Sequence, residues 1–281
     1  MAVILDGKKL AKKVIGQVRD EIKALGIEPG LAVVVVGDDP ASRIYVNSKK
    51  RDCKKCGIRS EEFALPESTS EESLLALLSE LNGRSDIHGI LVQLPLPGGL
   101  KPDKVTQAIA PGKDVDGFHM ENVWRLFVND YGFLPCTPAG ILEILAEYNI
   151  SPKGKNCVVV GRSTIVGKPM AMMLTNLGGT VTVCHSATAD LASFTQQADI
   201  LVAAIGRAEF FGQSFIKEGA VVIDVGINRR DDGSVCGDVD FEAVKHLASF
   251  ITPVPGGVGP MTRAMLMRNT LIGAKKTTEG K

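Results

Sequence analysis

The segment around position 45 carries a tyrosine and a lysine, Tyr45 and Lys49, four positions apart. On a helix this spacing puts both side chains on one face. Such a pair can relay protons if the pKa of the lysine is lowered, and like charge nearby disfavours a protonated lysine. Further cations crowd the same stretch, namely Lys50, Arg51, Lys54 and Lys55. The alternative is a solvated basic face with a half-buried tyrosine.

Three more polar side chains stand at the end of the strand expected at 87–94 or after it. Gln93 stands at the C-terminal end of that strand, where parallel sheets bind ligands, and a glutamine satisfied by loop backbone is an equal alternative. Asp114 and Asp116 follow within Lys113–Gly117. An extended Asp-x-Asp could ligate Mg²⁺, but no third ligand is evident. An Asp-Gly turn with solvated charge is the alternative.

A glycine-rich turn joins a strand to a helical pattern at Gly161–Pro169. Its glycines allow a sharp turn and a close approach to a phosphate, and the helix N-terminus adds N–H donors. The turn is not a P-loop, because the spacing from Gly161 to Gly167 is one residue too long and Pro169 replaces the magnesium-binding Ser or Thr. Ser163 replaces the middle glycine of G-x-G-x-x-G, so the turn alone could be a simple strand-to-helix connection.

The strand after this turn favours NADP over NAD. NAD sites usually carry an Asp or Glu about 20 residues further on, which binds the ribose 2′-hydroxyl. Here the strand ends in Val183–Ser186 without a carboxylate, and Arg162 lies in the turn itself. A cation and a hydroxyl without an anion suit a 2′-phosphate.

Short β-branched runs alternate along the chain with longer helical patterns. Strands are expected at 31–36, near 62–65, and at 87–94, 156–160, 181–184, 200–205 and 221–225. Asp39 and Pro40 are typical of a helix N-cap and first helical position. Gly57 is typical of a left-handed cap after that helix. The pattern predicts an α/β fold with two parallel units and a boundary near residue 137.

Composition narrows the class of protein. A length of 281 residues suggests roughly two domains. With 32 cationic and 32 acidic side chains the net charge is zero, which argues against a general nucleic-acid-binding surface. The apolar stretch Ala2–Leu5 is too short for a signal peptide, and no stretch is long enough to span a membrane. We therefore expect a cytosolic protein with reduced cysteines, in which Cys53 and Cys56 are two thiols on one helix face and no metal is bound.

Seven segments taken together resemble the bifunctional methylenetetrahydrofolate dehydrogenase/methenyltetrahydrofolate cyclohydrolase family, also called FolD. They are Tyr45–Lys49, Gly89–Pro97, Lys113–Gly117, Pro135–Pro138, Gly161–Pro169, Val222–Asn228 and Thr252–Met261. The resemblance runs from about Leu5 to about Thr270. No single segment is decisive, but seven in one order leave little room for coincidence.

The resemblance implies two α/β domains with parallel sheets and an active-site cleft between them. Residues 1–137 with 261–281 would form a discontinuous folate-binding catalytic domain, and 138–260 a Rossmann-type NADP-binding domain. It also implies a homodimer acting on small-molecule tetrahydrofolates in one-carbon metabolism, and through it in purine biosynthesis. Neither nucleic acid nor membrane is expected as a partner.

Two reactions at one site are implied by the same resemblance. NADP⁺ would oxidise 5,10-methylenetetrahydrofolate, and water would then open the methenyl product to 10-formyltetrahydrofolate. The catalytic residues would be Tyr45, Lys49, Gln93 and Asp116, with Lys49 transferring the proton of the second step. The folate site would add Val92, Leu94, Pro255, Gly256, Gly257, Val258 and Gly259. NADP would be bound by Gly161, Arg162, Ser163, Ser186 and Ile227.

Two other interpretations stand beside this one. A protein similar to shikimate dehydrogenase would share the two-domain architecture and a lysine–aspartate pair. The shikimate dehydrogenase family, however, has no counterpart of the segments Val92–Pro97 and Pro253–Pro260, which are present here. A non-catalytic nucleotide or folate sensor on the same scaffold would be favoured by loss of Lys49 or Gln93, and both residues are present.

Overall fold

The computed structural model describes residues 1–279 and divides the chain into two compact units. We call one the three-stranded unit, which holds Lys12–Cys136 and the chain from Arg263 onward. The other, the six-stranded unit, holds Met1–Ala11 and Thr137–Thr262. Each unit is built on a parallel sheet with helices beside it, so the predicted α/β class is confirmed.

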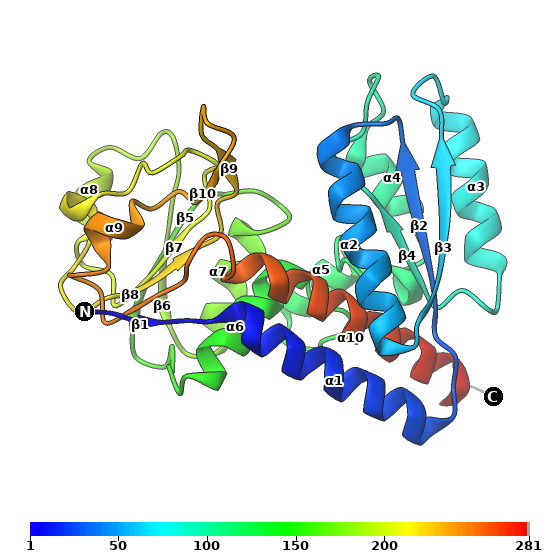
Figure 1. Cartoon of the computed structure of the whole chain (residues 1–281), viewed down its shortest axis with the longest axis horizontal. Helices are drawn as coiled ribbons and strands as arrows, with labels where there is room; N and C mark the ends of the chain where they lie inside the picture. The colour runs from blue at the N-terminus through cyan, green and yellow to red at the C-terminus, as the bar shows by residue number, and fades with distance from the viewer. Residues whose placement is uncertain (280–281) are drawn as a thin grey trace. The chain divides into compact units, whose positions relative to one another are not determined.

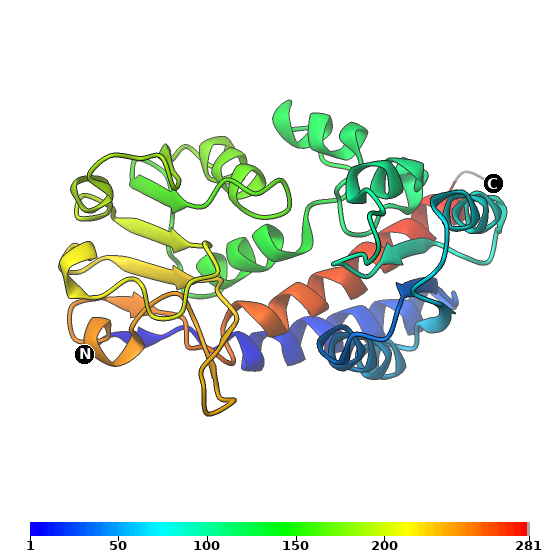
Figure 2. The same cartoon turned by 90° about the horizontal axis from the view of Figure 1, so that it is seen from above.

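The three-stranded unit is organised around strands in the order β3-β2-β4. All seven residues of β2 are buried, as expected for the central strand of a parallel sheet. Figures 1 and 2 show α2 and α3 on opposite faces of this sheet. The elements are β2 (Gly30–Val36), β3 (Arg59–Leu65), β4 (Gly89–Val92), α2 (Pro40–Cys56), α3 (Glu71–Gly83), α4 (Pro102–Ala108) and α5 (Met120–Phe127).

Local chemistry fixes both ends of α2, the helix that carries Lys49. The Asp39 side chain accepts a hydrogen bond from the backbone N–H of Ser42 at 2.7 Å, and Pro40 is the first helical residue. Gly57 has φ 80°, and its N–H donates to the carbonyl of Cys53. Because glycine adopts this left-handed conformation without strain, the helix ends where the sequence predicted.

The six-stranded unit contains a parallel sheet in the order β1-β11-β8-β7-β5-β6. Its core joins apolar residues of the strands, such as Val158, Leu201 and Val222, to Phe211. The strands are β1 (Val3–Ile4), β5 (Asn156–Val160), β6 (Thr180–Cys184), β7 (Ile200–Ala203), β8 (Val221–Asp224) and β11 (Phe250–Ile251). The other elements are α6 (Cys136–Glu147), α7 (Gly167–Asn176), α8 (Leu191–Thr195), α9 (Phe241–Val244) and a hairpin of β9 (Asn228–Arg229) and β10 (Val235–Cys236).

The N-terminal residues lie elsewhere than the sequence suggested. Residues 1–137 were expected in one domain, but Val3 pairs with Phe250 and Ile4 with Ile251, so β1 is an edge strand of the larger sheet. The chain then enters α1 (Gly7–Leu25), most of which belongs to the three-stranded unit. The chain ends in the long helix α10 (Val258–Glu279). None of the helices in residues 1–279 is long and apolar enough to cross a membrane.

Candidate active site

The amine of Lys49 lies against the amide of Gln93 in the three-stranded unit. Lys49 Nζ donates a hydrogen bond to Gln93 Oε1 at 2.9 Å. Gln93 directly follows β4, and its Nε2 donates to the carbonyl oxygen of Leu94 at 2.6 Å. Because the amide nitrogen is used in this way, the amide oxygen faces the lysine. The loop backbone thus satisfies the amide nitrogen, as the alternative expected, while the amide oxygen accepts from Lys49.

Burial controls the protonation of Lys49. Although the residue as a whole is half-buried, loss of water around its ammonium lowers the pKa of Lys49. The carboxylate of Asp116 opposes this shift, and the guanidinium of Arg263 adds to it. An amine with a lowered pKa can act as a base nearer to neutral pH.

The other basic side chains of α2 do not have the effect that the sequence suggested. The like charge of these neighbours was expected to disfavour protonated Lys49, but two of them, Lys50 and Lys55, form ion pairs with carboxylates. Lys50 pairs with Glu62 at 2.8 Å, and Lys55 pairs with Asp52 at 3.0 Å. The basic stretch is thus partly neutralised by ion pairs, and Lys49 differs from it by its burial.

Asp116 lies in the same unit and is half-buried as a residue, with its carboxyl group largely removed from water. Burial raises the pKa of Asp116 to about 6; the nearby Lys49 charge opposes the rise, and the charge of Asp114 adds to it. Asp114 is itself only 1% exposed and accepts hydrogen bonds from the N–H of His119 at 2.7 Å and from Asn122 Nδ2 at 2.9 Å. The segment does turn at Asp116–Gly117, as the alternative expected, but the carboxylate of Asp114 is not solvated.

Two side chains distant in sequence hold the loop that carries Asp116. Asn269 of α10 donates through Nδ2 to the carbonyl oxygens of Val115 at 2.8 Å and Leu134 at 2.9 Å. The thiol of Cys136 donates to the same Val115 carbonyl at 3.3 Å. Sequence reasoning missed Asn269, which stands between the equally polar Arg268 and Thr270 and carries no signal of its own.

The remaining folate-site candidates of this unit surround the same strand and helix. Tyr45 lies one helical turn before Lys49 and is 36% exposed. Val92 is the buried last residue of β4, and Leu94 follows Gln93 and is half-buried. The structure therefore brings the polar candidates to the C-terminal end of β4 and to α2.

The glycine-rich turn of the six-stranded unit is built around close backbone approaches. A Cβ on Gly161, whose φ is 130°, would lie 2.2 Å from the carbonyl oxygen of Ala204. A Cβ on Gly167 would lie 2.1 Å from the carbonyl oxygen of Gly161. The hydroxyl of Ser163 accepts hydrogen bonds from the N–H groups of Val166 at 3.2 Å and Gly167 at 3.3 Å. Ser163 thus shapes the start of α7.

A cavity of about 450 Å³ opens at the carboxyl edge of this sheet. It lies where the strand order reverses between β5 and β7, the place at which open parallel sheets bind nucleotides. Gly161, Arg162 and Ser186 are part of its lining, as expected for a nucleotide site. Ser163 and Ile227 lie outside that lining, and Ile227 is 52% exposed.

The sequence analysis missed a second cation in this cavity. Arg207 is part of the lining, and its guanidinium carbon lies 4.2 Å from the ring centre of Phe210. The buried carboxylate of Asp238 accepts hydrogen bonds from the N–H groups of three consecutive residues, Ile205–Arg207. The sequence did contain a signal for Arg207. A Gly-Arg pair, Gly206-Arg207, comes shortly after β7, just as Gly161-Arg162 comes after β5.

The segment Pro255–Gly259 belongs to the six-stranded unit and not to the unit that holds Lys49. The carbonyl of Gly256 accepts a hydrogen bond from the N–H of Lys8 at 2.8 Å, and α10 begins at Val258. These contacts fix the backbone of the segment at the junction between strand β11 and α10.

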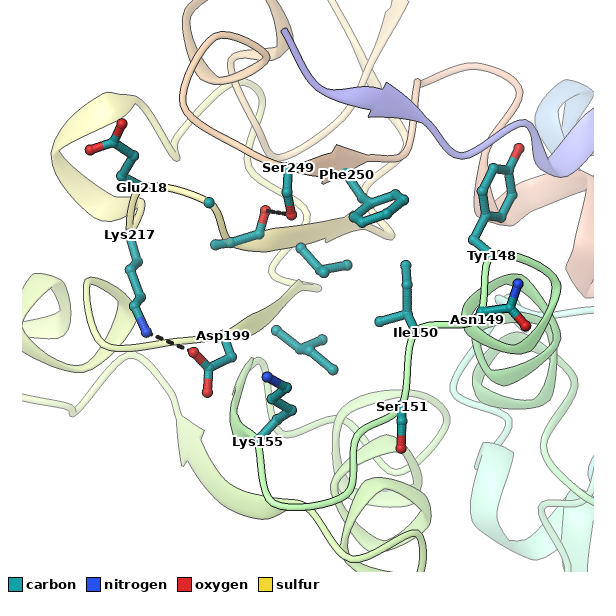
Figure 3. A pocket seen from close by; sticks show the side chains of 14 residues that line it. Tyr148, Asn149, Ile150, Ser151, Lys155, Asp199, Lys217, Glu218, Ser249 and Phe250 are labelled. Carbon is teal, nitrogen blue, oxygen red and sulfur yellow. Dashed lines mark hydrogen bonds and ion pairs between the residues drawn. The ribbon is translucent and has the colours of Figure 1, made fainter.

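A second cavity, of about 370 Å³, lies at the opposite edge of the same sheet (Figure 3). Its lining includes Tyr148, Lys155 and Phe250, and an ion pair joins Lys217 to Asp199 at 2.6 Å. None of the predicted site residues is among its lining. The cavity therefore has no part in the chemistry predicted from the sequence.

The Cys53–Cys56 pair lies within α2. Both thiols are buried, and burial raises the pKa of each to about 12. They remain protonated near neutral pH, as expected of inert buried thiols.

Two family models match the chain. The catalytic domain of tetrahydrofolate dehydrogenase/cyclohydrolase matches residues 5–116, and its NAD(P)-binding domain matches residues 135–278. The Bifunctional protein FolD of Ruminiclostridium cellulolyticum is 57% identical over 272 residues, which cover 96% of each chain.

Solved structures agree with these matches. The bifunctional enzyme FolD from Campylobacter jejuni is 48% identical with a TM-score of 0.96, covering 98% of this chain and 99% of that one. The Trypanosoma brucei FolD, a complex with NADP cofactor and inhibitor, is 36% identical with a TM-score of 0.94, covering 99% of this chain and 98% of that one. This chain therefore belongs to the tetrahydrofolate dehydrogenase/cyclohydrolase family.

Proposed function

We propose that this chain is a bifunctional enzyme that oxidises 5,10-methylenetetrahydrofolate with NADP⁺ and hydrolyses the methenyl product to 10-formyltetrahydrofolate. Family membership supports both activities. The observation that carries the assignment of residues is the contact of Lys49 Nζ with Gln93 Oε1, in surroundings that lower the pKa of Lys49. The family match also replaces the interpretation as a shikimate dehydrogenase-like protein.

The residues at the carboxyl edge of the six-stranded unit fit NADP. Gly161 and Gly167 let the turn pack closely on its own backbone at the start of α7, where helix N–H groups suit a pyrophosphate, and Arg162 and Arg207 supply positive charge for the 2′-phosphate. Ser186 lies beside them, and Ser163 acts by holding the turn in shape. NADP⁺ bound there supplies the hydride acceptor of the first reaction. Ile227 would add an apolar contact.

The first reaction needs little acid or base from the protein. Lone pairs on the folate nitrogens stabilise the cation that hydride loss creates, so the main task of the chain is to orient the donor carbon. Tyr45, Val92 and Leu94 would contact the folate, and Pro255–Gly259 would supply backbone for it.

The second reaction is the step for which we propose Lys49. Its neutral amine accepts a proton from water as the water oxygen bonds to the methenyl carbon. The resulting ammonium then returns a proton to the folate nitrogen whose bond to that carbon breaks, and the remaining hydroxyl proton of the adduct passes to solvent as the formyl C=O forms. Gln93 suits this cycle because its neutral amide holds the amine in place without the strong stabilisation of ammonium that a carboxylate would give.

Asp116 would bind the pterin by accepting hydrogen bonds from its amino and ring N–H groups. Because the pKa of Asp116 is raised to about 6, the accepting carboxylate exists above that pH and is lost below it. We therefore expect the KM for methylenetetrahydrofolate to rise about tenfold as the pH falls one unit below about 6. Initial dehydrogenase rates at several pH values measure this.

An Asp116→Asn variant provides the comparison for that prediction. Its KM should be high and should lack this dependence on pH, because the amide does not titrate. The titration of the folate itself affects both proteins equally and cancels in the ratio of the two KM values. A ratio that stays constant between about pH 7.5 and about pH 5 would show that Asp116 does not bind the pterin in its ionised form.

We also propose a homodimer, which the family resemblance supports. Sedimentation equilibrium of the purified protein tests it directly. A mass equal to that of one chain at micromolar concentration would exclude it.

The test of the proposed function is an absorbance assay on the purified chain. Incubation with methylenetetrahydrofolate and NADP⁺ should produce NADPH and methenyltetrahydrofolate, which should then decay to the formyl product. Retained binding of NADP⁺ without formation of either product would contradict the proposal and favour a non-catalytic sensor.

A further inference from the structure

An ion pair links α2 to the C-terminal helix one turn beyond Lys49. Asp52 stands three positions after Lys49, so the two side chains lie on neighbouring turns of one helix face. Arg263 of α10 donates through Nε to Asp52 Oδ2 at 2.8 Å, and Lys55 binds Asp52 Oδ1 at 3.0 Å. Asp52 is 4% exposed, so its carboxylate is held inside the protein by these two partners.

The two cations that bind Asp52 differ in exposure. The side chain of Lys55 is 63% exposed, and solvent screens its charge. The side chain of Arg263 is 28% exposed, and its pairing with a buried carboxylate fixes the guanidinium beside α2. Arg263 is therefore the partner whose charge is held in one place near the amine of Lys49.

Few of the groups that face Lys49 carry a charge near neutral pH. These groups are Gln93 after β4, Asp116 before α5, Cys136 at the start of α6, Cys53 on α2 and Arg263 on α10. Burial raises the pKa of both thiols, that of Cys53 to about 12, so neither is ionised. Of these five groups, only Asp116, which is negative, and Arg263, which is positive, carry a charge; Asp52, one turn beyond Lys49, adds a negative charge beside Arg263.

We propose that Arg263, anchored by Asp52, is a positioning residue that fixes a second cation beside Lys49 and so favours the neutral amine needed for proton transfer. The proposal rests on the proposed role of Lys49 and adds to it a device built from two residues 211 positions apart. Asp52 has two effects in this device. It holds Arg263 in place, and its own negative charge offsets part of the Arg263 charge.

Substitutions of the two partners should move the titration of Lys49 in opposite directions. Arg263→Gln removes the cation and exposes Lys49 to the carboxylate of Asp52, so the apparent pKa of Lys49 should rise by about half to one pH unit. Asp52→Asn removes the negative charge that partly cancels the charge of Arg263, so the apparent pKa of Lys49 should fall. Arg263→Lys keeps the charge and should remain near the wild type. The double variant should lie between the two single variants.

The measurement is competitive labelling of lysine amines in the ligand-free protein over a series of pH values. Fragment mass spectrometry resolves Lys49 from Lys50 and gives the apparent pKa of Lys49 without any catalysis. Lys104→Gln is the matched control, because it removes one cation from an ion pair with Glu71 in the same unit. This control should leave the titration of Lys49 unchanged. The double variant, which buries no unpaired charge, keeps the comparison available if Arg263→Gln fails to fold.

The outcomes separate this inference from the proposed function. The inference is supported if the apparent pKa of Lys49 rises in Arg263→Gln and falls in Asp52→Asn. It is overturned if that pKa moves in the same direction in both variants or does not move in either. The pH profile of methenyltetrahydrofolate hydrolysis is then measured on the same variants. The apparent pKa of Lys49 from labelling could shift in these variants while the pH profile of hydrolysis stays the same. In that case the role of Lys49 in hydrolysis is wrong, and the electrostatic role of Arg263 stands.

Discussion

Replacing Lys49 with methionine is expected to lower the rate of methenyltetrahydrofolate hydrolysis by about 10²–10⁴-fold, the usual contribution of a positioned acid–base group. Methionine has a similar length and an uncharged side chain that tolerates the loss of water around the Lys49 amine. It removes the group that accepts and returns the proton, and it leaves Gln93 Oε1 without its donor at 2.9 Å. The decay of the methenyl absorbance measures the rate after correction for spontaneous hydrolysis.

Lys50→Met is the matched control for this experiment. Lys50 is the next residue on α2, but its amine pairs with Glu62 at 2.8 Å. This variant should hydrolyse methenyltetrahydrofolate at nearly the wild-type rate. If Lys49→Met also kept the wild-type rate, Lys49 would not be the proton-transfer residue.

Replacing Arg162 with alanine is expected to weaken NADP⁺ far more than NAD⁺. A hydrogen bond between charged groups contributes about 1.5–3 kcal/mol, which corresponds to about a 10- to 100-fold rise in the KM for NADP⁺. NAD⁺ lacks the 2′-phosphate, so its KM should change by less than about threefold. Dehydrogenase rates at saturating folate with each nucleotide measure both constants.

Lys155→Ala provides the corresponding control in the six-stranded unit. Lys155 lines the cavity at the opposite edge of the sheet from Gly161 (Figure 3), so loss of its charge should affect neither nucleotide specifically. Equal losses of NADP⁺ and NAD⁺ in Arg162→Ala would contradict the assignment of Arg162 to the 2′-phosphate. Arg207 would then be the remaining cation of the cavity to test.

Features set by neighbouring residues could be predicted from the sequence. The start and end of α2 follow from Asp39, Pro40 and Gly57, each of which acts within one helical turn. The glycine-rich turn at Gly161 likewise follows from the strand before it and the helix after it. Such local rules also placed Gln93 at the end of β4, where it meets Lys49.

Features that depend on distant contacts could not be predicted in this way. The lowered pKa of Lys49 was attributed to its neighbours on the helix, but its main cause is burial, which only tertiary packing determines. The hydrogen bonds from Asn269 to the carbonyls of Val115 and Leu134 join residues 154 and 135 positions apart, and no sequence pattern predicts them. Strand β1 is two residues long, too short for any periodicity to be read.

The most direct test of the central claim is the product that each protein forms from methylenetetrahydrofolate and NADP⁺. The wild-type chain should convert the folate through to 10-formyltetrahydrofolate. The Lys49→Met variant should produce NADPH and accumulate methenyltetrahydrofolate, which then disappears only at the spontaneous rate. Formation of 10-formyltetrahydrofolate by the variant at the wild-type rate would contradict the account.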